Sequence, residues 1–116
     1  MTTTGIEVHY MDRGYSLFTW SDGRNEFLFT DETGHHTVEA ASYHQVAEWL
    51  DTTGRDDTAL LDETFYSMQN GIGAPHNVSE QLKIRSMMVG DLIILQTNNR
   101  GPKRTYRVAP IGFDRI

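Results

Sequence analysis

Apolar and polar side chains alternate along three short segments near the N-terminus. Residues 6–10 read Ile-Glu-Val-His-Tyr, residues 15–20 are rich in aromatic side chains, and residues 26–30 read Glu-Phe-Leu-Phe-Thr. A period of two with β-branched and aromatic side chains is typical of half-buried strands. Turn-forming residues follow the second and third segments, at 21–24 and 31–34. The sequence therefore predicts an N-terminal β hairpin or meander.

The pattern changes to a helical period over residues 42–54. Ser42 and Gln45 match a capping box, in which each side chain satisfies a free backbone N–H at the start of a helix. The side chains at positions 43, 46, 47 and 50 are Tyr, Val, Ala and Leu, a spacing that places them on one face of a helix. We predict a first helix that begins after Ser42 and ends at Gly54.

A second helix is predicted to begin near residues 56–58, where two aspartates favour the positive end of a helix dipole. It would bury Leu61, Phe65 and Met68 and end at residues 70–71, which read Asn-Gly. Residues 71–84 are predicted to form an irregular connection.

The C-terminal third predicts a pair of strands. Residues 92–95 form a short apolar run, residues 97–103 have hairpin composition, and residues 105–109 return as the partner strand before residues 110–113 close the domain. Together these elements predict a single α+β domain over residues 1–116. It contains an N-terminal β hairpin or meander, two helices and a C-terminal antiparallel β pair.

Composition narrows the class of protein. A chain of 116 residues, with 38% hydrophobic and 22% charged residues, fits one independently folding domain. The absence of cysteine excludes disulfides and thiolate chemistry and fits a reducing compartment. The polar start and the lack of an apolar run of about 20 residues disfavour secretion and membrane insertion. We expect a cytoplasmic protein, and the sequence leaves its oligomeric state open.

The net charge of −6 is unevenly distributed along the chain. Residues 1–82 contain 14 acidic and 3 basic residues, a net charge of −11, whereas residues 83–116 contain 2 acidic and 7 basic residues, a net charge of +5. Two interpretations follow. The basic third neutralises the acidic part within the fold, or the protein presents surfaces of opposite sign to different partners.

Residues 85–91, which read Arg-Ser-Met-Met-Val-Gly-Asp, form a predicted turn before the apolar strand. We expect Gly90 to adopt a backbone conformation denied to other residues, Asp91 to cap the turn with its carboxylate, and Val89 and Leu92 to point into the core. An alternative places the Ser86 hydroxyl and the Asp91 carboxylate in a pocket, but nothing nearby supplies a base or oxyanion donors. The structural candidates in this turn are Arg85, Ser86, Met87, Val89, Gly90 and Asp91.

The order of this turn, a strand, a hairpin, Tyr-Arg-Val at 106–108 and Ile-Gly-Phe at 111–113 resembles the YodL-type small domains. The resemblance covers residues 65–116, including Gln-Asn-Gly at 69–71, and residues 1–64 share only a coarse order of strands and helices. Met88 stands where those domains usually have Ser. They occur in phage, plasmid and other mobile-element proteins of largely uncharacterised function. The resemblance therefore implies an origin more than an activity.

Histidines and paired acids are the candidate metal-binding and catalytic groups. The histidines lack the spacing of a recognised zinc site, and we expect no metal or other cofactor; they are His9, His35, His36, His44 and His76. The acidic pairs at 31–32, 56–57 and 62–63 would suit catalytic carboxylates, but each also lies where a turn or helix start favours negative charge. Capping therefore explains most of them.

The hairpin at residues 98–107, the basic hairpin, is the candidate nucleic-acid contact. Arg100, Lys103 and Arg104 lie at or beside its tip, and Arg107 lies on the adjoining strand. Such cations can neutralise phosphates without reading sequence. Only Tyr106 is close enough to stack on a base, which favours a solvated turn instead.

These patterns favour a non-catalytic accessory or interaction protein of a phage or mobile element, with the acidic N-terminal two-thirds contacting an unidentified host protein. In a sharper version, the acidic surface mimics nucleic acid. The alternative is a nucleic-acid-binding module that uses the basic hairpin. A small enzyme is the third possibility, disfavoured because the sequence has no Gly-rich phosphate loop, nucleophile elbow or metal-ligand spacing.

Overall fold

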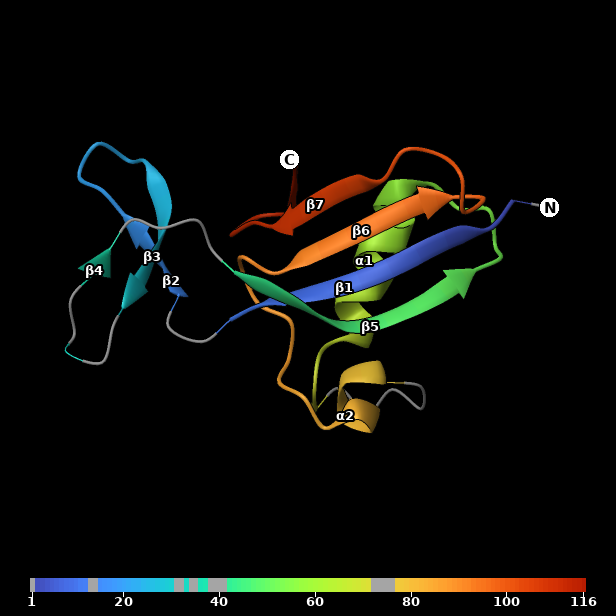
Figure 1. Ribbon diagram of the computed structural model, residues 1–116, viewed down its shortest axis with the longest axis horizontal. Helices are drawn as coiled ribbons and strands as arrows, with labels where there is room; N and C mark the ends of the chain where they lie inside the picture. Colours follow the sequence, from blue (N-terminus) through green and yellow to red (C-terminus); the bar gives the residue numbers. More distant parts are fainter. Residues whose placement is uncertain (1, 13–14, 31–32, 34–35, 38–41, 72–76) are drawn as a thin grey trace.

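An antiparallel sheet of five strands organises most of the chain. The computed structural model describes residues 2–12, 15–30, 33, 36–37, 42–71 and 77–116. Within these residues the strand order is β5-β1-β6-β7-β8 (Figure 1). β1 lies between β5 and β6 and pairs with both, which joins the two ends of the chain. The strands are β1 Thr4–Met11, β5 Tyr43–Asp51, β6 Leu92–Thr97, β7 Arg104–Val108 and β8 Phe113–Arg115.

A second, three-stranded antiparallel sheet contains β2 (Tyr15–Thr19), β3 (Asn25–Thr30) and β4 (His36–Thr37). Figure 1 shows it beyond one end of the larger sheet. The β2–β3 connection turns where predicted, with the Trp20 N–H donating to the Arg24 carbonyl oxygen at 2.8 Å. The predicted N-terminal meander is therefore confirmed for β2 and β3, whereas β1 joins the larger sheet. Of the predicted turn at 31–34, only Thr33 is among the described residues.

The core lies between the larger sheet and α1 (Asp57–Ser67). Alternate residues of β1 and β6 face it, as expected for strands with one buried face, and α1 lies behind the sheet in Figure 1. Its fully buried members include Val8, Leu60, Met68, Ile93 and Leu95. Across the described residues, neither α1 nor the shorter α2 (Val78–Leu82) is long and apolar enough to cross a bilayer.

The predicted first helix is wrong, because residues 43–51 form β5. The register with β1 shifts between Val8 and His9, where Val46 is the extra residue of a bulge. A bulge breaks the strict alternation of a strand, so Val46 and Ala47 are both partly buried. That local pattern imitates the i, i+3, i+4 spacing of a helix. Leu50, the fourth member of the expected helical face, is 66% exposed.

The second predicted helix and the C-terminal strand pair are confirmed as α1, β6 and β7. Three smaller expectations need correction. Residues 78–82 of the expected irregular connection form α2, and the closing segment at 110–113 leads into β8. Leu92 is only partly buried, while Ile93 and Leu95 fill the core. Residues 72–76 of that connection lie outside the described residues. The α+β fold class is confirmed.

Candidate binding site

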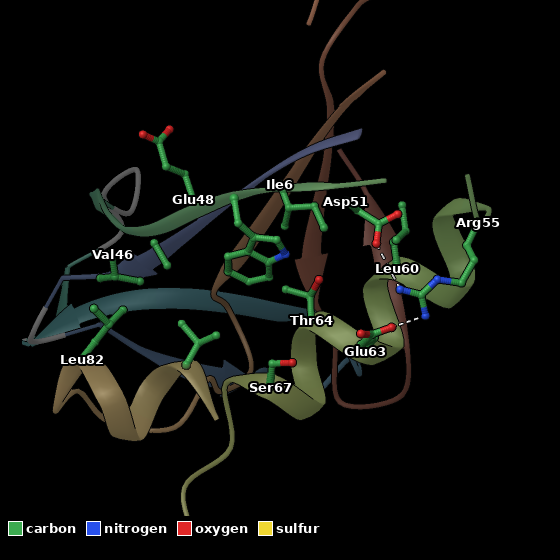
Figure 2. Close-up of a pocket in the computed structure, with 13 residues that line it drawn as sticks. Ile6, Val46, Glu48, Asp51, Arg55, Leu60, Glu63, Thr64, Ser67 and Leu82 are labelled. Carbon is green, nitrogen blue, oxygen red and sulfur yellow. Dashed lines mark hydrogen bonds and ion pairs between the residues drawn. The ribbon is translucent and has the colours of Figure 1, made fainter. Parts of the chain in front are cut away.

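A cavity of about 380 Å³ lies between β5, the adjoining β1 and the two helices (Figure 2). We call it the β5 cavity, and its volume falls in the range of about 300–1,000 Å³ that is usual for ligand sites. In Figure 2, Leu82 on α2 lies opposite Val46 on β5. Leu82 is 47% exposed, so the cavity reaches solvent beside α2. The apolar wall consists of Ile6, Val46, Ala47, Trp49, Leu60, Val78 and Leu82.

Local hydrogen bonds fix α2 as one wall of the cavity. Asn77 caps the helix by accepting the Glu80 N–H at 2.9 Å, and its amide nitrogen donates to the carbonyl oxygen of Gln69. The Ser79 hydroxyl lies 2.5 Å from Asn70 Oδ1 and 2.7 Å from Asn77 Oδ1. A helix of five residues is not stable by propensity alone. These contacts, which include two to the segment that follows α1, therefore hold Val78 and Leu82 in place.

Charged side chains form the rim of the β5 cavity. Arg55 Nη2 lies 3.1 Å from Asp51 Oδ1, and a second guanidinium nitrogen contacts the Glu63 carboxylate (Figure 2). Thr53 donates its hydroxyl to Asp51 at 2.6 Å and accepts from Arg55 at 2.7 Å. Glu48 also borders the cavity and points away from the helices. With three carboxylates and one guanidinium, the rim has a net charge of −2.

Asp51, on the rim, keeps its negative charge at neutral pH. Burial alone would raise the pKa of Asp51, but hydrogen bonds from Thr53 and Arg55 outweigh it and hold that pKa below its ordinary value. Arg55 is already occupied by two carboxylates, so it has little capacity for a further anion. An apolar cavity with an acidic rim suits an apolar group that lies next to a cation.

The predicted turn at residues 85–91 is a structural centre of the fold. The Asp91 carboxylate is fully buried and accepts the backbone N–H groups of Met11 and Met88, both at 2.9 Å. It also accepts hydrogen bonds from the two terminal guanidinium nitrogens of Arg85, Nη1 at 2.7 Å and Nη2 at 2.9 Å. The Arg85 guanidinium stacks on the Tyr10 ring, 4.1 Å from its centroid. Burial and the Asp91 charge raise the pKa of Tyr10 to about 12, with Arg85 opposing them.

The remaining residues of this turn also form hydrogen bonds within the fold or pack against the core. Gly90 has φ +102°, which confirms the expected conformation, and its N–H donates to the Val108 carbonyl oxygen at 2.9 Å. Met87 is buried and Val89 packs against the core. The Ser86 hydroxyl accepts the Asn70 N–H at 2.8 Å. The contacts of Ser86 and Asp91 thus favour the structural interpretation over a pocket.

Two cations of the basic hairpin contact acidic residues of the N-terminal part. Arg104 donates to both oxygens of Asp57 at 2.7 and 2.9 Å, and Lys103 Nζ lies 3.1 Å from Glu7. Arg107 Nη2 lies 4.0 Å from Asp114, and Arg100 is exposed. These ion pairs support the interpretation that the basic third neutralises part of the acidic chain.

The histidines and acidic pairs do not assemble into a metal site in the described part of the chain. His9 lies beside Glu7 and His44 beside Asp12, whereas His36 lies in β4. His35, His76 and the pair at 31–32 lie outside the described residues. Of the other acids, Asp56 caps α1 and Asp57 pairs with Arg104. Glu63, of the pair at 62–63, is part of the cavity rim.

Asp57 predicts an acid-sensitive contribution to stability. The hydrogen bond from Arg104 holds the pKa of Asp57 below its ordinary value, against partial burial and with help from Tyr106. A depressed carboxyl pKa stabilises the fold above about pH 4, and this stability is lost as pH falls through the folded-state value. We expect Asp57→Asn to lower the free energy of unfolding by about 1 kcal/mol at pH 7, and by much less at pH 3.

Urea unfolding at the two pH values measures this difference. Asp62→Asn is the control, since Asp62 is exposed on the same helix. An equal effect of Asp57→Asn at both pH values would contradict the assignment.

Sequence patterns alone did not identify the β5 cavity. Its β5 wall was assigned to a helix, and Val78 and Leu82 were assigned to an irregular connection. The adjacent apolar pair Val46-Ala47 and the Asn77 capping position were the available signals.

Comparison of the chain with protein-family models, curated proteins and solved structures finds no significant match.

Proposed function

We propose that this chain is a non-catalytic interaction protein that binds a partner protein through the β5 cavity. The observation that carries the proposal is the apolar cavity with an acidic rim at the edge of the main sheet. Exposed apolar surface beside a rim of net negative charge favours association with a complementary surface. The YodL-type resemblance adds the proposal that the chain belongs to a phage or mobile element and that the partner is a host protein.

The acidic excess of this chain favours a partner with a basic surface. Residues 1–82 have a formal net charge of −11, and Lys103 and Arg104 of the basic hairpin pair with two of their 14 acidic residues, Glu7 and Asp57. A basic partner surface would gain both attraction and faster association. A host nucleic-acid-binding protein has such a surface, which keeps mimicry of nucleic acid within the proposal.

Affinity capture from host lysate tests this function. We expect the tagged protein to retain a partner after nuclease treatment, and Leu82→Asp to lose it, because the added carboxylate lies at the cavity mouth. Ile111→Asp is the matched control, since Ile111 is 92% exposed and does not line the cavity. Capture that requires nucleic acid, or that is identical for all three proteins, would count against the proposal.

Nucleic-acid binding through the basic hairpin is the second candidate. Its support is the cationic tip, but Lys103 and Arg104 already contact carboxylates, and the whole chain is net negative. We expect negligible affinity for generic duplex or single-stranded DNA at physiological salt.

A salt titration of fluorescent DNA measures this affinity. Arg100→Ala/Lys103→Ala removes cations without disturbing the Arg104–Asp57 pair. Micromolar binding whose logarithmic salt slope falls by about 2 units in this variant would favour the nucleic-acid function instead.

A further inference from the structure

β5 is a long edge of the main sheet. It contains nine residues and pairs with β1 on one side, with no strand on its other side in the described residues. Edge strands present unpaired N–H and C=O groups to which another strand can bind, and short edges reduce this risk. The opposite edge, β8, has only three residues. The sheet is therefore better suited to accept a strand at β5 than at β8.

The β5 cavity lies next to the regular part of this edge. After the bulge, residues 47–51 pair regularly with β1. Ala47 and Trp49 lie opposite the buried residues Val8 and Ile6, so they share the helix-facing side of the sheet, whereas Glu48 is on the other side. In a strand added beside residues 47–51, alternate side chains would point toward the cavity and α2. The cavity would receive one large apolar side chain.

The charges near this edge favour basic residues on either side of the partner's apolar residue. Asp51 and Glu63 border the cavity on the helix side, and Glu48 is exposed on the opposite side of β5. A lysine or arginine at a position adjacent to the apolar residue would reach Glu48. One two positions away would lie beside Asp51 and Glu63 and would share these carboxylates with Arg55. The edge therefore favours a basic strand over an acidic one.

We propose that β5 accepts an extended segment of a partner protein as an added strand, with an apolar side chain in the β5 cavity and flanking lysine or arginine at its rim. This inference rests on the proposed function and specifies how the partner binds. A second copy of the same chain fits poorly. Antiparallel pairing of β5 with the same strand of a second copy would bring two acidic rims together. Each whole chain also has a net charge of −6.

The test selects peptides that bind the full chain from a random library of peptides of about ten residues, the usual length of a long strand. We expect enriched peptides to alternate in polarity and to carry a bulky apolar residue flanked by lysine or arginine. N-methylation of the backbone nitrogens that face β5 should weaken binding by about tenfold, whereas methylation of the intervening nitrogens should have little effect. Amide chemical shifts should change at residues 47–51.

Two substitutions locate the bound peptide. Leu82→Asp should weaken binding by more than about tenfold through loss of the apolar contact, and Glu48→Lys should weaken it most at low salt. Asp62→Lys is the control for charge reversal, because Asp62 is exposed on α1 and does not line the β5 cavity. Each variant is checked for an unchanged circular dichroism spectrum.

The outcomes separate this inference from the proposed function. Peptides that require Leu82 but tolerate every N-methylation would overturn strand addition and leave the interaction function intact. Strand addition would also be overturned if the library yielded only acidic peptides or no binding peptide. The same holds if this chain formed a dimer that Glu48→Lys alters. The proposed function itself fails if the lysate capture requires nucleic acid or is independent of Leu82.

Discussion

Replacing Asp91 by Asn is expected to lower the free energy of unfolding by about 3 kcal/mol, because the loss of a buried acceptor leaves hydrogen-bond donors around it unsatisfied. Asp91 has no exposed surface, and its two oxygens accept four hydrogen bonds from Arg85, Met11 and Met88. An asparagine has a similar shape but only one acceptor oxygen, and its amide group would face donors. The Arg85 charge would also lose its carboxylate.

Urea unfolding at pH 7 measures this loss, with Asp114→Asn as the control. Asp114 lies 4.0 Å from Arg107 with 58% of its side chain exposed, so its removal should change stability by less than about 1 kcal/mol. Arg85→Met completes a double-mutant cycle with Asp91→Asn, and we expect the two effects to be strongly non-additive. Similar losses for Asp91→Asn and Asp114→Asn would show that the contacts of the Asp91 carboxylate do not stabilise the fold.

The sequence predicted those parts of the fold whose cause is local. β1, β3, β6 and β7 follow from alternation or a short apolar run, and α1 follows from the Asp56 cap with Leu61 and Met68 on one face. The conformation of Gly90 was predicted because a Gly-Asp pair precedes an apolar strand. In each case, residues close in the chain contain the whole signal.

The remaining features depend on contacts between distant residues. The bulge that makes residues 43–51 resemble a helix exists only because β5 pairs with β1. Asp91 was expected to cap its own turn, but it also accepts the N–H of Met11, 80 residues away. The β5 cavity needs β5, α1 and α2 together. Local periodicity contains no information about these distances, so the candidate site could not be predicted from it.

Gly90→Val is expected to destabilise the fold by about 1–3 kcal/mol, because a β-branched residue rarely adopts a positive φ. Gly90 has φ +102° and is buried. Its N–H donates to the Val108 carbonyl oxygen at 2.9 Å, and its carbonyl oxygen accepts the Tyr43 hydroxyl at 2.9 Å. Rotation of the backbone toward a conformation that suits valine would break both bonds and displace the adjacent Asp91.

Gly5→Val separates this strain from the general effect of adding a side chain to glycine. Gly5 lies in β1, where valine is favoured, and a Cβ there would meet the Gln96 carbonyl oxygen at 3.7 Å and Leu50 at 3.9 Å, both ordinary contacts. We expect Gly5→Val to retain the parent stability or exceed it slightly, since glycine weakens a strand interior. Thermal and urea unfolding measure both variants. If Gly90→Val melted with the parent protein, the positive φ at this turn would not be required for the fold, and the turn would be free to adopt an ordinary backbone conformation.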